Sequence, residues 1–256
     1  LFRGNVMTET EDDRARRLLT ARIDRNLPKR FYKQVTVADC DEGFEIRLDG
    51  RAVKTPLKRT FAVPSRNMAD AIAAEWDAQD THIDPSSMIV TRLANTAVDR
   101  VRGDEARIIT ELMDFAASDL VCYRAGIPDP LVARQARHWD PVMDWVRQVH
   151  GVQFICVEGI VHRAQPAPAL AAIAQARGAE EEFRLTAIHN MTTLTGSVLI
   201  AMMTAASALP GEDAWAAAHV DEDWQIEQWG SDDEAEARRA ARKRDFEATL
   251  EFMGMC

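Results

Sequence analysis

The stretch LTAIHNMTTLTGSVLIAMMTAASALPG (residues 185–211) decides the fold, because it contains no Asp, Glu, Lys or Arg. A segment of this length could cross a bilayer, which requires about 20 apolar residues. However, it includes His189, Asn190 and several threonines and is therefore less apolar than a membrane span. The pattern favours a buried helix over residues 180–208 at the centre of a soluble helical bundle.

Upstream of this helix, the chain shows the alternation that is typical of half-buried strands. Phe44, Ile46 and Leu48 alternate strictly with polar residues, and a similar alternation covers residues 31–37. A further short strand is expected over residues 60–63. These segments predict a small antiparallel sheet or partial barrel.

The dipeptide Asp49-Gly50 predicts how two of these strands are joined. Both residue types accept positive φ, which a two-residue hairpin loop requires. In such a hairpin Leu48 lies opposite Arg51, and Ile46 lies opposite Val53.

From Ser65 onward, apolar residues recur at helical spacing. Ser65 follows Pro64 and is expected to cap a helix that ends near Gln79. Further helices are predicted near residues 89–102, 104–123 (capped by Asp104), 130–150, 167–177, 180–208, 211–229 and 232–253, with a short strand possible within Gln153–Val157. The change of period predicts an α+β protein with three parts: an N-terminal extension with a charged helix (residues 1–28), a β-rich domain (29–88) and a helical domain (89–256).

Charge and cysteine usage limit the classes of partner and compartment. The chain has 31 Lys and Arg against 41 Asp and Glu, a net charge of −10, which argues against a polyanion as its main partner. The basic run at residues 238–244 lies among Glu and Asp residues of the same predicted helix, so it leaves no positive stripe for nucleic acid.

The four cysteines form no CxxC pair, which indicates free thiols in a reducing compartment. The first residues lack an apolar signal-peptide segment and are too acidic for a mitochondrial presequence.

The common signatures of enzymes are absent from the chain. It has no GxGxxG, GxxxxGK[ST], GxSxG or HExxH motif. The six histidines never lie three or four residues apart, so no two of them can bind a metal from one helical face. We therefore expect no cofactor, no metal site and no catalytic residues.

The predicted helix 211–229 contains the most unusual local pattern. At 100° per residue, one arc holds Trp215, Ala218, Glu222, Ile226 and Trp229. A second apolar patch, with Val220 and Trp224, lies on the opposite side.

A carboxylate buried among aromatic residues without a partner costs several kcal/mol. Three interpretations of Glu222 therefore stay open. It forms an internal ion pair with an arginine such as Arg238 or Arg239, it contacts a partner protein, or it acts as a catalytic acid or base.

This helix and six other segments resemble one protein family. The helix reads AWAAAHVDEDWQIEQWG (214–230) and is followed by a DxEAxxRRxxRxxDF pattern (232–246). The other matching segments are DGRAVKTP (49–56), AAEWDAQ (73–79), TRLANTAVDR (91–100), DLVCYRA (119–125), HWDPVMDW (138–145) and FRLTAIHNMTTLTGS (183–197). Together they resemble the assembly chaperones of the F-type ATP synthase alpha subunit, over most of residues 30–252.

The resemblance implies a fold and a function. The fold is a small N-terminal antiparallel β domain followed by a larger orthogonal α-helical bundle. The function is to bind the unassembled alpha subunit, without enzymatic activity or cofactor, until the beta subunit replaces the chaperone. Eukaryotic members of this family work in the mitochondrial matrix, but the acidic start and the high Ala and Arg content favour a bacterial member, for which we expect a cytoplasmic location. We also expect the free protein to be a monomer.

Trp215, Glu222, Trp224 and Trp229 are the residues that we expect to contact the alpha subunit. Five other residues match family motifs and are interpreted as interdomain or core residues: Trp76, Arg92, Asn95, Tyr123 and Arg124. Two alternatives stay open, namely a small-molecule binder or enzyme that uses Glu222 with His219, and an oligomeric scaffold without a client.

Overall fold

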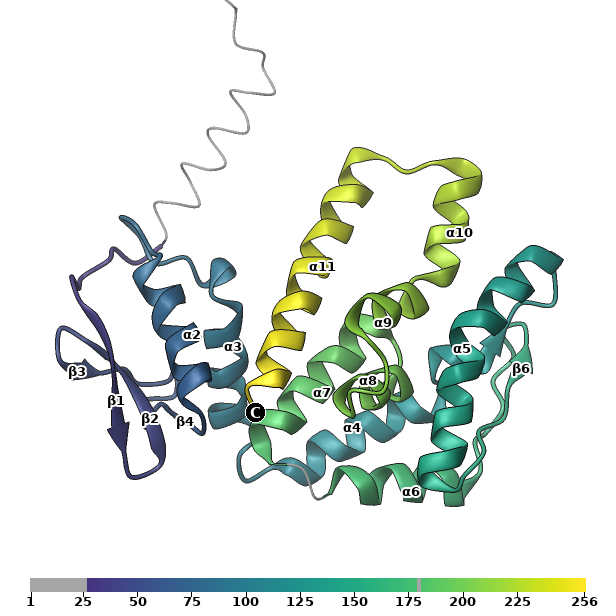
Figure 1. Cartoon of the computed structure of the whole chain (residues 1–256), viewed down its shortest axis with the longest axis horizontal. Coiled ribbons are helices and arrows are strands. Elements are labelled where there is room, and N and C mark those ends of the chain that lie inside the picture. The colour runs from purple at the N-terminus through teal and green to yellow at the C-terminus, as the bar shows by residue number, and fades with distance from the viewer. Residues whose placement is uncertain (1–26, 179–180) are drawn as a thin grey trace, which may run out of the picture.

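The computed structural model describes residues 27–178 and 181–256, so the charged helix expected in the N-terminal extension, over residues 12–25, lies outside the described residues. Figure 1 shows a small sheet at one end of the molecule, followed by helices that make up most of the rest. The α+β class and the order of its two parts are confirmed.

The larger sheet is built around one central strand. β2 (Gly43–Leu48) pairs antiparallel with β1 (Val35–Cys40), β3 (Arg51–Ala52) and β4 (Ala62–Val63). Leu48 pairs with Arg51, as predicted. The Val53 amide donates to the Ile46 carbonyl oxygen at 2.8 Å. Asp49 and Gly50 both have positive φ, so the hairpin prediction is confirmed.

The sheet begins later than the alternating pattern predicted. The backbone amides of Lys33 and Gln34 donate to the Asp49 carboxylate, at 3.1 and 2.9 Å, instead of to a neighbouring strand. The ladder with β2 therefore starts at Val35. The strand expected at residues 60–63 is reduced to β4 and one isolated bridge between Thr60 and Lys54.

Two helices connect the sheet to the rest of the molecule. α2 (Arg66–Asp77) begins as predicted, because the Ser65 side chain accepts a hydrogen bond from the Met68 amide. A short 3-10 turn, η1 (Pro85–Ser87), precedes α3 (Ile89–Thr96), which continues into a π-helical turn, η2 (Ala97–Val101).

The helical part follows in chain order. Its elements are α4 (Glu105–Ala117), η3 (Leu120–Cys122), β5 (Tyr123–Arg124), α5 (Asp129–His150), β6 (Val157–Glu158), α6 (Ala167–Arg177), α7 (Glu182–Thr195), α8 (Val198–Ala205), α9 (Gly211–Ala218), α10 (Val220–Trp229) and α11 (Asp233–Gly254). β5 and β6 form a separate two-stranded parallel sheet. The short strand expected within Gln153–Val157 thus lies later in the chain, and only Val157 belongs to both.

The single helix predicted over residues 180–208 is wrong, because the chain breaks between α7 and α8. Gly196 adopts the left-handed conformation, with φ +71°, and ends α7. The Ser197 side chain then accepts from the Ile200 amide at 3.0 Å and caps α8. Hydropathy does not reveal this break, because both helices are apolar.

The helix predicted at residues 104–123 was expected to be capped by Asp104, and this expectation is wrong. Asp104 makes no capping hydrogen bond. Its carboxylate instead accepts from Arg107 at 2.6 Å. The helix ends at Ala117, and η3 covers Leu120–Cys122 as a separate 3-10 turn.

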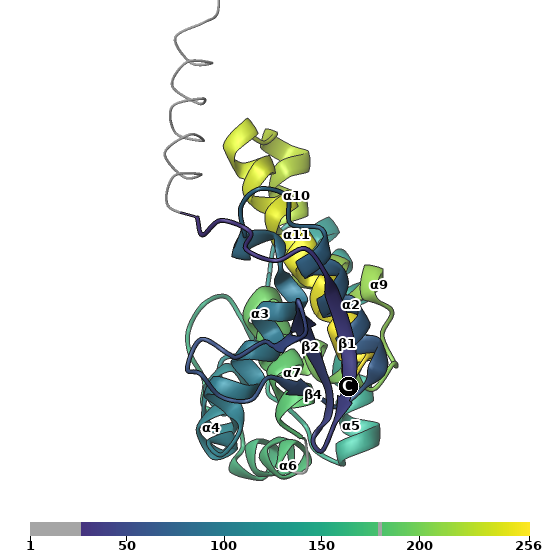
Figure 2. The same ribbon diagram turned by 90° about the vertical axis from the view of Figure 1, so that its left-hand side faces the viewer.

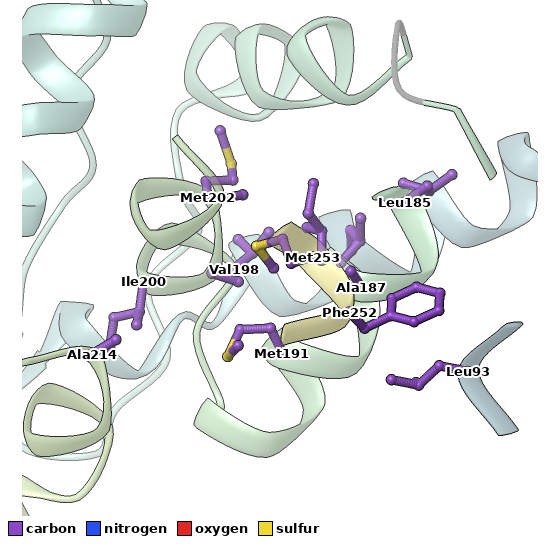
Figure 3. Packing of buried hydrophobic residues seen from close by; sticks show 14 of the residues in the cluster. Leu93, Leu185, Ala187, Met191, Val198, Ile200, Met202, Ala214, Phe252 and Met253 are labelled. Atoms are coloured by element: carbon purple, nitrogen blue, oxygen red, sulfur yellow. The ribbon is translucent and has the colours of Figure 1, made fainter. Parts of the chain in front are cut away.

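The uncharged stretch lies at the centre of the molecule, as expected. Figure 3 shows Leu185, Ala187 and Met191 of α7 beside Val198 of α8 and Phe252 of α11. They belong to one continuous buried cluster that also includes Ile46, Phe61 and Val63 of the sheet region. Among the described residues, no helix is both long and apolar enough to cross a membrane. The domain boundary between residues 88 and 89 stays a prediction.

Candidate partner-binding surface

The segment predicted as one helix over residues 211–229 is two helices. α9 ends at Ala218, and α10 begins at Val220, because His219 leaves the helical conformation with φ −118° and ψ 19°. The stripe predicted from Trp215 to Trp229 assumed one unbroken helix. Because the helix breaks at His219, these residues do not form a single surface. Trp215 is buried on α9, whereas Trp229 at the end of α10 is 77% exposed.

Trp215 and His219 form a stacked pair inside the molecule. Their ring centroids lie 3.7 Å apart, and Phe246 of α11 contacts Trp215 edge-on at 5.3 Å. The buried His219 donates through Nδ1 to the Trp215 carbonyl oxygen at 2.8 Å. Burial lowers the pKa of His219 below its usual value, so the ring is neutral at pH 7. The pair thus fixes the corner between α9 and α10.

Glu222 lies among three basic side chains. Its carboxylate is 3.3 Å from Arg239 and 3.7 Å from Arg242 of α11, and 3.9 Å from His219 Nε2. The internal ion pair with Arg239 is confirmed, whereas Arg238 pairs with Glu234 instead. Glu222 nevertheless keeps 40% of its side chain exposed, so the pair leaves the carboxylate accessible.

Arg239 and Arg134 attach α10 to its two neighbours. Arg239 also donates to Asp223, so it binds two successive carboxylates of α10 to α11. Arg134 of α5 donates to both carboxylate oxygens of Glu227, at 2.9 and 2.7 Å. The Arg134 guanidinium lies 5.5 Å from the centre of the Trp224 ring, which is half-buried. Bidentate pairs of this kind orient a helix as well as attach it.

An open pocket of about 530 Å³ lies between α10 and the start of α11. Its walls are formed by Glu222, Gln225, Ile226, Trp229, Gly230, Ser231, Asp232, Ala235, Glu236 and Arg239. In Figures 1 and 2 the α10–α11 end stands away from the sheet and from α7. We call Glu222, Ile226, Trp229 and the pocket between them the α10–α11 surface.

Three of the other motif residues lie at contacts between elements. Arg92 of α3 pairs with Asp245 of α11 at 3.3 Å, which joins the first and the last helix of the predicted helical domain (residues 89–256). Trp76 packs against Tyr32, with ring centroids 5.7 Å apart. Arg124 pairs with Asp140 at 2.8 Å and lies over the buried Trp139 ring.

Asn95 and Tyr123 complete this set. The Asn95 side-chain oxygen is buried without a hydrogen-bond partner in the described part of the chain. The Tyr123 hydroxyl lies 3.2 Å from His162. Neither residue reaches the α10–α11 surface.

Sequence reasoning missed two features near β5 and β6. Ile127, Ile160 and Val161 are strongly exposed apolar residues, and Cys122 and Cys156 lie next to each other at the start of neighbouring strands. No spacing in the chain signals either feature, because the two strands are separated by α5. Within residues 27–178 and 181–256, no cluster of three side chains could hold a metal ion.

Known proteins match both the chain and its fold. The family model described as ATP12 chaperone protein matches residues 29–147. Mitochondrial atp12 of Schizosaccharomyces pombe is 24% identical over 219 residues, which are 81% of this chain and 75% of that protein.

Two crystal structures of bacterial proteins are similar over almost their whole length. A protein from Agrobacterium tumefaciens, described as a putative chaperone, is 48% identical with a TM-score of 0.85, over 93% of this chain and 90% of that one. Atp12 from Paracoccus denitrificans is 32% identical with a TM-score of 0.83, over 89% of this chain and 98% of that one. With this identity, coverage and fold in common, the chain belongs to the ATP12 family of chaperones for F1 ATP synthase assembly.

Proposed function

We propose that the protein binds the unassembled alpha subunit of the F1 sector, and that the α10–α11 surface makes the contact. The observation that carries this proposal is an accessible carboxylate, Glu222, beside an open pocket whose rim carries the exposed Trp229. A subunit that awaits its neighbours exposes an apolar interface, which is an aggregation hazard. A chaperone for it needs apolar anchors surrounded by polar groups.

The four residues expected at the contact have different parts in this proposal. Trp229 is the anchor, because an exposed tryptophan buries a large apolar surface when it enters an interface. Glu222 accepts hydrogen bonds from the client, and its arginine neighbours hold its side chain in place. Trp215 and Trp224 support the surface from inside, through the stack on His219 and the contact with Arg134.

We infer further that the protein acts by binding alone, without catalysis. His219 is buried and neutral, and its Nδ1 is already bonded to a carbonyl oxygen, so it is poorly placed to exchange protons with a substrate. The alternative is a small molecule held in the 530 Å³ pocket by Glu222. A ligand of that kind would raise the melting temperature of the purified chain, whereas a client-specific chaperone gains stability only from the alpha subunit.

We also propose that the free chaperone is a monomer in the bacterial cytoplasm. The high identity to the Agrobacterium protein supports a bacterial source. Sedimentation of the purified chain tests the monomer, and a stable dimer would instead support the scaffold interpretation.

Co-expression with the cognate alpha subunit alone tests the proposed client. We expect more alpha subunit in the soluble fraction, and a complex that dissociates when the beta subunit is added. If the alpha subunit stays aggregated and no complex co-purifies, the client assignment is wrong.

Two substitutions then test the α10–α11 surface. Glu222→Gln and Trp229→Ala should each weaken binding about tenfold or more, which is about 1.4 kcal/mol, at unchanged circular dichroism. Glu111→Gln is the matched control for the first, because Glu111 is also 40% exposed and pairs with an arginine and a histidine. Phe31→Ala is the control for the second, because Phe31 is 73% exposed but lies near the hairpin residues Asp49 and Arg51 of the sheet. Folded variants that bind like their controls would place the contact elsewhere.

A further inference from the structure

Two cysteines that are distant in the chain meet at the two-stranded parallel sheet. β5 and β6 pair in the register Tyr123–Val157 and Arg124–Glu158. Cys122, the last residue of η3, and Cys156 each immediately precede this first pair, so the pairing of the two strands brings them side by side. Neighbouring strands lie about 4.8 Å apart, which is within the Cα separation that a disulfide spans. Both cysteines are free, and the interaction between their thiols is the largest cause of the pKa shift of each.

The two thiols have different surroundings. Cys122 is completely buried, whereas Cys156 is exposed to solvent. The positive charge of Arg124 favours the thiolate form of Cys156 and lowers its pKa. This guanidinium is held in place by the Asp140 carboxylate at 2.8 Å and by the Trp139 ring. An accessible sulfur beside a fixed cation is the environment of reactive cysteines.

The interaction between the two sulfurs shifts their pKa values in opposite directions. The neighbouring Cys122, together with Arg124, lowers the pKa of Cys156 to about 6, although partial burial and Asp140 act against this. The same interaction, burial and the nearby Asp119 raise the pKa of Cys122 above its usual value. Of the two sulfurs, Cys156 is therefore the one that loses its proton more readily.

We propose that Cys156 and Cys122 form a redox-sensitive modification site, in which Cys156 reacts with a peroxide and Cys122 closes a reversible disulfide. The Cys156 thiolate attacks one peroxide oxygen, so that an S–O bond forms as the O–O bond breaks. The sulfur loses two electrons to the peroxide, and the departing hydroxide takes up a proton to become water. The Cys122 sulfur then attacks the sulfenic sulfur of Cys156. The S–S bond forms, the S–O bond breaks, and the Cys122 proton leaves with the oxygen as a second water.

The pair is arranged for the second step as well as for the first. The interaction with the Cys156 thiolate is the main cause of the high pKa of Cys122, and that negative charge disappears when Cys156 becomes a sulfenic acid. Cys122 is then easier to deprotonate at the moment when it has to attack. The disulfide would restrain the start of β6, which leads directly to the exposed Ile160 and Val161.

Peroxide treatment of the reduced full-length protein tests this proposal independently of any client. Mass spectrometry after quenching should show a Cys122–Cys156 cross-link that dithiothreitol reverses. Without peroxide, Cys156 should alkylate at pH 7 at least about tenfold faster than Cys256, an exposed cysteine that serves as the control within the same chain.

Two single substitutions separate the two steps. Cys122→Ser should stop the reaction at a sulfenic acid on Cys156 that dimedone traps, whereas Cys156→Ser should leave Cys122 reduced. The proposal is overturned if peroxide gives no cross-link between the two residues, or if Cys156 alkylates no faster than Cys256. Because wild-type protein provides both decisive readouts, a variant that does not fold cannot mask the result.

Discussion

At the scale of single residues, Asp119 shows how one buried side chain connects distant parts of the chain. Its fully buried carboxylate accepts hydrogen bonds from the amides of Val121, at 3.2 Å, and Leu199, at 3.1 Å. It thereby joins η3 to the start of α8. Burial raises the pKa of Asp119 to about 6, although hydrogen bonds from Ser197 and from backbone amides counteract this effect.

This raised pKa makes stability depend on pH. The unfolded chain has an Asp pKa of about 3.9, so between about pH 4 and pH 6 the folded state binds more protons at Asp119 than the unfolded state does. This carboxylate should therefore make the protein less stable as pH rises through that window, by up to about 3 kcal/mol in total.

Urea denaturation of wild type and Asp119→Asn across that window measures the effect. Asp119→Asn loses a hydrogen-bond acceptor and is expected to be less stable overall, but the decisive quantity is how the difference between the two proteins changes with pH. The wild type should lose stability relative to the variant as pH rises. Parallel stability curves would mean that Asp119 does not titrate in this range.

At the scale of secondary-structure elements, the helix breaks shape the candidate surface. Gly196 ends α7 with φ +71°, and its Cβ position is free of close contacts, since the nearest atom is Leu120 Cβ at 3.9 Å. The glycine is therefore required by backbone conformation and not by lack of space. The break at His219 acts similarly, because it separates the buried Trp215 from the exposed Trp229.

Gly196→Ala should lower the free energy of unfolding by about 1–2 kcal/mol, which is the cost of an L-residue in the left-handed conformation. Gly254→Ala is the matched control, because Gly254 lies in the last turn of α11, without positive φ and without a neighbour within 4 Å of its Cβ position. The control should be neutral or more stable by up to about 1 kcal/mol. Guanidinium denaturation compares the two, and equal effects would show that the left-handed turn carries no strain.

At the scale of the whole molecule, the sheet and the helices share one apolar core. Phe252 of α11 is fully buried and packs against Phe183 at 6.4 Å in the same cluster as Ile46 of β2. Ser65, the cap of α2, also donates to the carbonyl oxygen of Met255 at 2.6 Å. The C-terminal end of α11 is thus fastened to the first helix after the sheet.

Phe252→Ala should cost about 3–5 kcal/mol, through lost apolar contact and the cavity that remains. Because the core is continuous, we expect the amides of β2 and of α7 to lose protection together in hydrogen exchange. If α7 loses protection while β2 keeps its own, the sheet is an independent domain that ends near residue 88.

Much of this protein follows from local pattern. The hairpin at Asp49-Gly50, the Ser65 cap and the central place of residues 185–211 depend on neighbours a few residues away, and all three are confirmed. The long motifs spread along the chain also identify the family by themselves, because each is a continuous run of residues that can be recognised without any tertiary contact.

Only the tertiary structure determined which side chains are exposed and which of them contact each other. Periodicity assumes an unbroken helix, so it could not place Trp215 inside the molecule and Trp229 outside it. Nor could it choose Arg239 as the partner of Glu222 over Arg238, or bring Cys122 beside Cys156 across the whole of α5. Such contacts are fixed by how separate elements pack, because the free energy that selects them comes from surfaces that no local stretch of sequence contains.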